Sequence, residues 1–210
     1  MSDDEHGWLR TPLTDPAEIE RYYDEWVSTY DRQLADWGYE APHVAATILV
    51  EAASPGPVLD VGCGTGLVGR ALRERGVGGI DGIDLSSASI AAALATGAYR
   101  ATVQHNLDHL PLPYPDDTYA GAVCAGVLSY VADLGALITD LCRVLTSGSP
   151  FVATYRSDLF VERDVAGLVQ GLVDRGLLRS VSWSEVRPYM PGNPNFGEAI
   201  GIRYGTLVVA

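Results

Sequence analysis

The apolar residues of this chain follow two different periods, and the two periods alternate along the sequence. Short apolar runs bounded by glycine or proline predict buried strands, and apolar positions three or four residues apart predict helices with one apolar face. Strands are expected over residues 58–61, 79–84, 100–106, 119–124, 151–155, 180–187 and 200–209, and helices over residues 15–37, 41–53, 67–72, 87–95, 133–145 and 158–175. This order predicts an α/β fold: a doubly wound, seven-stranded sheet in an α/β/α sandwich, closed by an antiparallel hairpin.

The first expected helix carries a stripe of aromatic side chains. Asp15 and Pro16 suit a helix start, and Gly38 suits its end. The residues that share one face of this helix are Ile19, Tyr22, Tyr23, Trp26, Val27, Tyr30 and Leu34. Such a stripe is usually a core contact, and the alternative is that it covers a ligand site.

Length and composition indicate one folded globular domain. The 210 residues are 47% hydrophobic and 20% charged, which suits a single sizeable core. No run of about 18 apolar residues occurs and the first ten residues are acidic and polar, so we expect no membrane segment, no secretion signal and a cytoplasmic protein. Cys63, Cys124 and Cys142 have no CxxC spacing, which disfavours a disulfide framework or a zinc site.

The charged residues exclude several kinds of function. A formal net charge of −13 disfavours a nucleic-acid partner, because phosphate binding relies on clustered lysine and arginine. All 14 basic residues are arginine. A Walker-type phosphate lysine, a pyridoxal Schiff base and a Tyr-x-x-x-Lys dehydrogenase pair are therefore absent.

The most informative stretch runs from Val58 to Gly69, where an apolar run, a group of glycines and a helical pattern follow one another. They predict a strand that turns sharply into a helix, where backbone N–H groups approach a nucleotide cofactor. Two interpretations compete. Gly64-x-Gly66-x-x-Gly69 satisfies the NAD and FAD pattern, whereas Asp60 suits a cofactor with an amino-acid end and no pyrophosphate. Asp84 follows Gly62 at the offset where an acid meets a ribose in doubly wound folds.

The longer string Leu59-Asp60-Val61-Gly62-x-Gly64-x-Gly66 resembles motif I of class I methyltransferases, which bind S-adenosylmethionine in a Rossmann-like domain. Residues 106–112 are similar to the adenine loop of many members, with Asn106 in place of an acid. Tyr119-Ala120 likewise replaces the usual Phe-Asp. Tyr23-Asp24-x-Trp26-x-x-x-Tyr30-Asp31, with Tyr39-x-Ala41-Pro42 and Ala153-Thr154-Tyr155-Arg156, looks like the Williams-Beuren-region methyltransferase-like group of this superfamily.

The resemblance implies an arrangement of the chain and a set of contacts. Residues 1–54 would form a helical lid segment, and residues 55–210 the methyltransferase domain. Tyr130 and Arg156 follow strand ends and are candidates for substrate contact. The implied cofactor-binding residues are Tyr23, Tyr30, Asp60, Gly62, Cys63, Gly64, Thr65, Gly66, Asp84, Leu85, Ser89, Asn106, Leu107, Ala125 and Val127.

The implied activity is methyl transfer from S-adenosylmethionine to an oxygen or nitrogen atom of a small molecule. It needs no covalent residue and no metal, since holding donor and acceptor together can contribute roughly 7 to 11 kcal/mol. His43, His105, His109 and the tyrosines are candidate bases, and the sequence singles out none of them; the oligomeric state is equally open. Two alternatives remain: a non-catalytic S-adenosylmethionine-binding protein, suggested by Asn106 and Ala120, and an NAD-dependent oxidoreductase.

Overall fold

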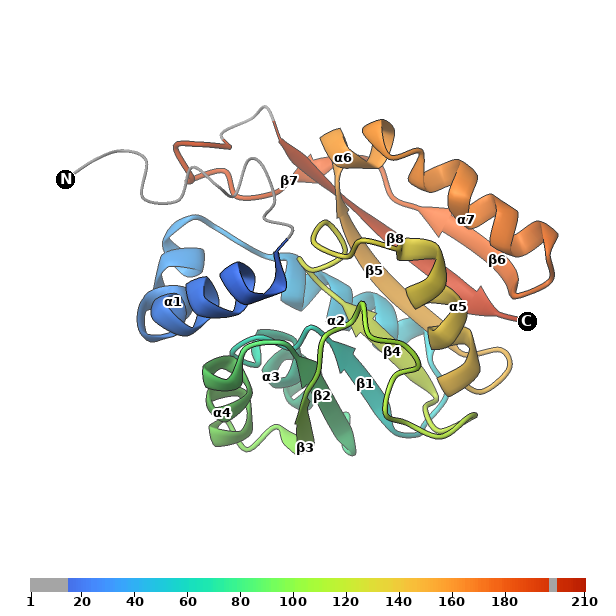
Figure 1. Cartoon of the computed structure of the whole chain (residues 1–210), viewed down its shortest axis with the longest axis horizontal. Coiled ribbons are helices and arrows are strands. Elements are labelled where there is room, and N and C mark those ends of the chain that lie inside the picture. Colours follow the sequence, from blue (N-terminus) through green and yellow to red (C-terminus); the bar gives the residue numbers. More distant parts are fainter. Residues whose placement is uncertain (1–14, 197–199) are drawn as a thin grey trace.

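A sheet forms the middle layer of the structure, and helices cover both of its faces (Figure 1). The computed structural model describes residues 15–196 and 200–210. The helices are α1 (Pro16–Asp36), α2 (Ala41–Ala52), α3 (Leu67–Glu74), α4 (Ser87–Ala95), α5 (Leu134–Val144), α6 (Ser157–Glu162) and α7 (Val165–Asp174). The strands are β1 (Val58–Val61), β2 (Ile80–Asp84), β3 (Tyr99–Gln104), β4 (Gly121–Cys124), β5 (Pro150–Arg156), β6 (Leu178–Trp183), β7 (Arg187–Pro188) and β8 (Gly201–Val209).

The strand order in the sheet is β3-β2-β1-β4-β5-β8-β6, and the short β7 pairs with β8. Strands β1 to β5 pair in parallel, whereas β8 runs antiparallel to β5, β6 and β7. The order reverses between β1 and β4, and open α/β sheets bind ligands outside the carboxyl ends of strands at such a point. The predicted doubly wound, seven-stranded sandwich with an antiparallel end is confirmed.

Alternate residues of each strand enter two different apolar cores, because successive side chains of a strand point to opposite faces. In β1, Leu59 and Val61 pack on the side of α5, α6 and α7, while Val58 packs on the side of α1, α2 and α3. All four residues of β1 are buried. Full burial of such an apolar side chain contributes about 1.5 to 3 kcal/mol, so these strands are held firmly and can position the loops that follow them.

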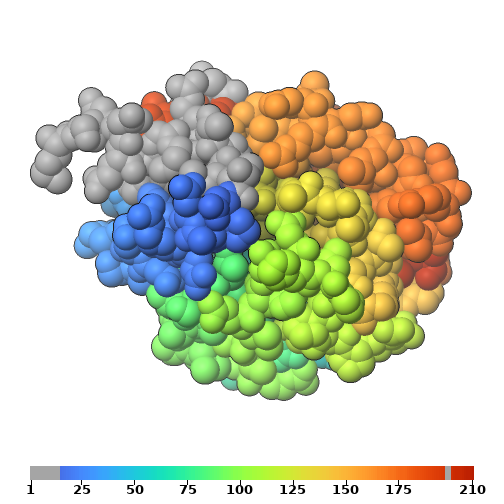
Figure 2. All heavy atoms as spheres, viewed as in Figure 1, coloured from blue at the N-terminus to red at the C-terminus, as the bar shows by residue number. Residues whose placement is uncertain are grey.

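Helix α1 begins as the sequence predicts and lies across the top of the parallel strands. The Asp15 carboxylate accepts a hydrogen bond from the Ala17 N–H at 2.9 Å, and Pro16 occupies the first turn. Trp26 and Leu34 on its apolar face are buried. In the space-filling view of Figure 2, the blue surface of α1 meets the green surface of the segment that includes α4. The aromatic stripe is therefore partly core and partly available to a site.

Three predicted elements differ from the structure. The helix expected over 158–175 is divided into α6 and α7, because Asp164 has a φ of +44° and caps α7 by accepting from the Gly167 N–H. The strand expected over 180–187 is interrupted between β6 and β7. The strand expected from Tyr119 begins at Gly121, and Tyr119 forms only an isolated bridge with Leu145. None of the described helices has the length and apolar character needed to span a lipid bilayer.

Candidate active site

A cavity lies at the carboxyl ends of β1, β2 and β4, where the strand order reverses. Its empty volume is about 770 Å³, including the part open to solvent. Cavities at such a reversal point commonly hold cofactors and small molecules. The lining residues are Pro16, Ile19, Glu20, Tyr23, Tyr30, Gly62, Gly64, Asp84, Leu85, Ser86, Ser89, Asn106, Leu107, Asp108, Ala125, Gly126, Val127, Tyr130 and Val131.

The glycine turn after β1 forms one wall of the cavity. Gly62 and Gly64 have φ values of +72° and +50°, in the left-handed region that favours glycine. A Cβ at Gly62 would lie 2.3 Å from Cγ2 of Val127, so the turn and the loop after β4 can approach only because Gly62 has no side chain. A Cβ at Gly64 would meet no atom of the described chain within 4 Å. The backbone at Gly64 is therefore open to a ligand.

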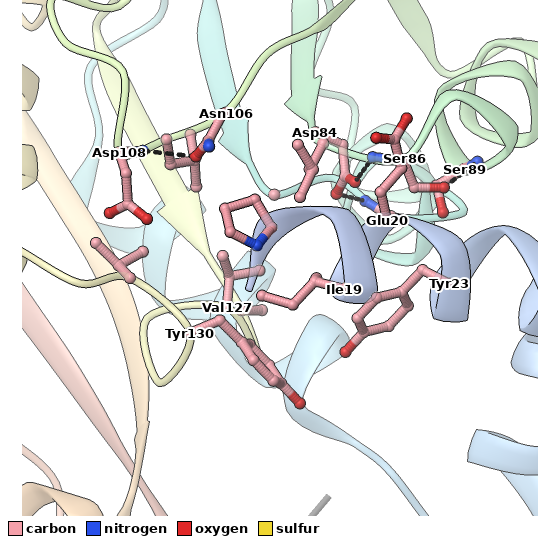
Figure 3. A pocket seen from close by; sticks show the side chains of 18 of the residues that line it. Ile19, Glu20, Tyr23, Asp84, Ser86, Ser89, Asn106, Asp108, Val127 and Tyr130 are labelled. Carbon is pink, nitrogen blue, oxygen red and sulfur yellow. Dashed lines mark hydrogen bonds between the residues drawn. The ribbon is translucent and has the colours of Figure 1, made fainter. Parts of the chain in front are cut away.

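Asp84 ends β2 and presents its carboxylate beside the glycine turn (Figure 3). Its Oδ2 accepts from the Gly64 N–H at 2.8 Å, and its Oδ1 accepts from the Ser86 N–H at 2.9 Å. Burial raises the pKa of Asp84, and these backbone donors act in the opposite direction. Because a carboxylate has about four acceptor positions, Asp84 can also accept hydrogen bonds from ligand hydroxyls.

Asp60 lies under the glycine turn, on the side of the sheet that α3 covers. Its side chain is fully buried, and Oδ2 accepts from the Tyr99 hydroxyl at 2.6 Å. The same hydroxyl accepts from the Gly69 N–H at 3.0 Å. Burial raises the pKa of Asp60 to about 7, although the Tyr99 hydrogen bond lowers it. Oδ1 of Asp60 has no partner among the described residues, and such a buried acceptor fits a ligand donor.

Helix α1 closes the cavity on the other side and is fastened by three acidic side chains. Each of them bonds to a different loop or helix start at the cavity rim. Glu20 accepts from Gln104 at 2.8 Å, Asp24 from the Ser86 hydroxyl at 2.5 Å and the Ala88 N–H at 3.2 Å, and Asp31 from the Thr65 hydroxyl at 2.5 Å and Arg70 at 2.7 Å. The position of α1 thus depends on the loops after β1, β2 and β3.

The loop after β3 brings an amide and a carboxylate to the wall (Figure 3). The Asn106 side-chain oxygen accepts from the Asp108 N–H at 2.9 Å, so it stabilises its own turn. Oδ1 of Asp108 accepts from the Ala132 N–H at 2.9 Å. Asp108 therefore supplies a carboxylate two residues after Asn106, which stands where the adenine loop of many class I methyltransferases has an acid.

Tyrosine side chains occupy the end of the cavity away from Asp84 and Asn106 (Figure 3). The ring centroid of Tyr23 lies 6.3 Å from that of Tyr130 and 6.0 Å from that of Tyr30. Burial raises the pKa of all three hydroxyls, which stay protonated at neutral pH.

Two further tyrosines lie behind the loop that follows β4. The rings of Tyr39 and Tyr189 meet edge to face, with their centroids 5.5 Å apart. A Cβ at Gly126 would lie 2.8 Å from the Tyr39 hydroxyl and 3.7 Å from that of Tyr189. Burial raises the pKa of both hydroxyls. We call Tyr23, Tyr30, Tyr39, Tyr130 and Tyr189 the tyrosine cluster.

Most residues that the sequence proposes for the site share the cavity wall. They are Tyr23, Tyr30, Gly62, Gly64, Asp84, Leu85, Ser89, Asn106, Leu107, Ala125, Val127 and Tyr130. The wall also includes residues that the sequence did not suggest: Pro16, Ile19, Glu20, Ser86, Asp108, Gly126 and Val131. Two of them had a usable signal, because Glu20 lies one helical turn before Asp24 and Asp108 completes an Asn-x-Asp turn.

Five proposed residues lie off the wall, for different reasons. Asp60 and Cys63 are buried below the turn, and a Cβ at Gly82 would lie 2.8 Å from the Cys63 sulfur. Thr65 bonds to α1, and Gly66 caps α3 with a φ of +95°. Arg156 is 6% exposed and pairs with Asp158 at 2.6 Å, over the Phe196 ring. Any role of these five in ligand binding stays a prediction.

The histidines of the described part of the chain do not line the cavity. His43 is exposed on α2, and Nε2 of His105 lies 2.7 Å from the carbonyl oxygen of His109 in the loop after β3. Within residues 15–196 and 200–210, no three His, Cys, Asp or Glu side chains are grouped so that they could hold a metal ion.

A reversal-point cavity with a glycine turn on one side and a second-strand acid on the next is typical of class I, S-adenosylmethionine-dependent methyltransferases and of other nucleotide-binding doubly wound folds. Residues 58–148 match the methyltransferase domain family. The chain is 37% identical over 178 residues to human Methyltransferase-like protein 27. The alignment covers 77% of this chain and 72% of that protein. The chain belongs to the class I methyltransferases, and its activity is S-adenosylmethionine-dependent methyl transfer.

Solved structures share this fold at low sequence identity. A Thermotoga maritima methyltransferase described as a possible histamine N-methyltransferase superposes with a TM-score of 0.66 at 13% identity, over 90% of this chain and 99% of that one. A second structure is that of Haemonchus contortus phosphoethanolamine N-methyltransferase 2 in complex with phosphomonomethylethanolamine and S-adenosylhomocysteine. It superposes with a TM-score of 0.60 at 12% identity, over 78% of this chain and 52% of that one. The family match and the 37% identical relative, and not these structures, exclude the oxidoreductase and non-catalytic alternatives.

The cavity also fits S-adenosylmethionine on its own geometry. The open backbone at Gly64 and the carboxylate of Asp84 offer space and an acceptor for a cationic nucleoside. Among the residues that the structure describes, no lysine or arginine lines this cavity, so the wall suits a cofactor without a pyrophosphate.

Proposed function

We propose that this enzyme transfers a methyl group to an oxygen or nitrogen atom of a small molecule, within the cavity between the glycine turn and α1. The observation that carries the proposal is the division of the cavity. Its acidic, backbone-rich end contains Gly64, Asp84 and Asp108, and its other end is formed by tyrosines. One end suits the cofactor, and the other suits an acceptor.

The cofactor contacts follow from the donors and acceptors at the first end. Asp84 would hold the ribose hydroxyls, because its carboxylate faces the cavity. The backbone of Gly62 and Gly64 would hold the amino-acid end, and Asp60 would accept from its ammonium group. The backbone of Leu107, with the Asn106 and Asp108 side chains, would meet the adenine. The bound cofactor supplies an electrophilic methyl group; the chain positions the reactants and excludes water.

The shape of the site supports a small acceptor. Helix α1 covers the cavity and contributes Tyr23 and Tyr30 to its wall, so the acceptor would lie in an enclosed space. The net charge of −13 works against RNA or DNA. The Haemonchus contortus structure also contains a small molecule, phosphomonomethylethanolamine, which supports the proposal by analogy.

We also infer that residues 1–54 act as the lid segment, and that α1 is its moving part. Residues 1–14 lie outside the described residues. The narrower assignment to the Williams-Beuren-region methyltransferase-like group rests on the motif from Tyr23 to Asp31. Its acids, Asp24 and Asp31, are those that fasten α1 to the rim.

The proposal is tested by following a radioactive methyl group from S-adenosylmethionine in a cell extract. The purified enzyme should label material that passes a 3 kDa filter, and an Asp84→Asn variant should label far less. Label retained only on protein or nucleic acid would refute the small-molecule acceptor.

A further inference from the structure

The tyrosine end of the cavity is rich in hydrogen-bond donors and poor in bases. We propose that the methyl acceptor is an anionic oxygen of a small molecule, such as a carboxylate or an ionised phenol or enol. This inference rests on the proposed function. The hydroxyls of Tyr23, Tyr30 and Tyr130 would hold this oxygen, and no general base would take part.

The donors converge from separate parts of the chain. Tyr23 and Tyr30 come from α1, and Tyr130 from the loop after β4; all three line the cavity. Tyr39 and Tyr189 reach the back of that loop at Gly126, which itself lines the cavity. Ring contacts join Tyr23 with Tyr30 and Tyr130 at the cavity wall, and Tyr39 with Tyr189 behind the loop. Oxygen anions accept several hydrogen bonds at once, so a group of neutral hydroxyls suits them.

The described wall offers tyrosine hydroxyls as donors, and its carboxylates already accept hydrogen bonds from the chain. The tyrosine hydroxyls are held in their protonated form by burial, which raises the pKa of each. Glu20 is bonded to Gln104, and Asp108 to the Ala132 N–H. Asp84 lies away from Tyr130 in the cavity (Figure 3), although its charge reaches Tyr30. An acceptor that is already ionised needs none of these groups.

Arg156 adds positive potential behind the cluster. Its guanidinium is buried beside Asp158 and stacks over Phe196 at 5.3 Å, and Phe196 stacks on Tyr189 at 5.6 Å. Its charge lowers the pKa of Tyr130 and Tyr189, against the stronger effect of burial. The Asp158 carboxylate offsets part of this charge, and the remainder favours an anion over an ammonium group at the same position. Arg156 is thus a positioning residue, acting through the tyrosines.

The reaction balances without a proton transfer. A lone pair of the acceptor oxygen forms the new O–C bond while the S–C bond of the sulfonium breaks, and that electron pair stays on sulfur. The anion and the sulfonium become a neutral methyl ester or ether and a neutral thioether centre. Both charges are lost, so a site of neutral donors is sufficient.

The experiment compares matched probes on the full-length protein saturated with S-adenosylhomocysteine. Benzoate and phenylacetate are titrated by calorimetry beside benzyl alcohol, 2-phenylethanol, benzylamine and 2-phenylethylamine. The carboxylates should bind at least tenfold more tightly than the alcohols and amines of the same skeleton. Tyr130→Phe, which removes one donor and keeps the ring, should weaken carboxylate binding about 10- to 100-fold.

The control is Tyr114→Phe, because Tyr114 packs against Tyr119 in the other core and does not line the cavity. Tyr114→Phe should leave the affinities for the carboxylates and for the matched alcohols and amines unchanged. Equal or tighter binding of the amines or alcohols overturns the inference, as does an equal effect of both tyrosine variants. A protein that does not bind S-adenosylhomocysteine refutes the proposed function instead, so the two failures are distinguishable.

Discussion

Replacing Asp60 by asparagine should change how the stability of this enzyme depends on pH. Asp60 is fully buried, and burial raises its pKa from 3.8 to about 7. Between these two values the folded protein keeps a proton on Asp60 that the unfolded chain has released. The free energy of unfolding therefore falls as the pH rises through this window. An asparagine side chain cannot ionise, so the variant lacks this loss.

The size of the effect follows from the shift. Each pKa unit corresponds to about 1.4 kcal/mol, so a rise from 3.8 to about 7 amounts to about 4 kcal/mol over the whole window. Between pH 5 and pH 8 the part contributed by Asp60 is about 2.5 kcal/mol. Any constant cost of the asparagine amide is the same at both pH values and cancels in the comparison.

The measurement is urea unfolding of the wild type and Asp60→Asn at pH 5 and pH 8, without cofactor. The stability of the variant relative to the wild type should improve by about 2.5 kcal/mol at the higher pH. Other carboxylates titrate alike in both proteins. If the difference between the two proteins is the same at both pH values, Asp60 is not a buried acid with a raised pKa, and the account of this site is wrong.

Three further substitutions test other parts of the site. Asp84→Asn should weaken S-adenosylhomocysteine binding by about 1 to 3 kcal/mol in calorimetry, and an unchanged affinity would contradict the ribose role. Gly62→Ala should destabilise the fold more than Gly64→Ala in urea unfolding, because its Cβ would lie 2.3 Å from Val127 whereas that at Gly64 meets nothing within 4 Å in the described chain. Equal costs would mean that only backbone strain matters. Arg143→Met removes bonds to two carbonyl oxygens of the proline-rich loop and should cost about 1 to 3 kcal/mol; full stability would contradict this anchor.

The fold could be predicted from the sequence where hydrophobic period and turn chemistry agree. Val58–Val61 is short, apolar and followed by glycines, so strand β1 and the turn to α3 were predicted within a residue. The division of α6 from α7 could not be predicted, because Asp164 carries no sequence signal that distinguishes a left-handed cap from an ordinary helical residue. The local pattern of apolar residues and turn residues therefore predicts the helices and strands, whereas the conformation of a single residue such as Asp164 depends on tertiary packing.

The cofactor end of the site was predictable because its residues follow strands directly. The positions of Asp84 and Gly64 at the cavity wall could be predicted from the rule that ligands bind at the carboxyl ends of parallel strands. The acceptor end was not, since Tyr39 and Tyr189 are 150 residues apart in sequence (189 − 39) and meet only in the folded chain. Arg156 was placed correctly at a strand end, but its pairing with Asp158 turns it away from the wall.

The fastening of α1 by Glu20, Asp24 and Asp31 has a consequence for turnover. One helix is tied at once to the loops after three strands, so the spent nucleoside cannot leave until several ties are released together. Those ties are polar and lie near solvent, where water can substitute for each of them. We therefore expect detachment of this helix, and not the methyl transfer itself, to limit the rate of the catalytic cycle.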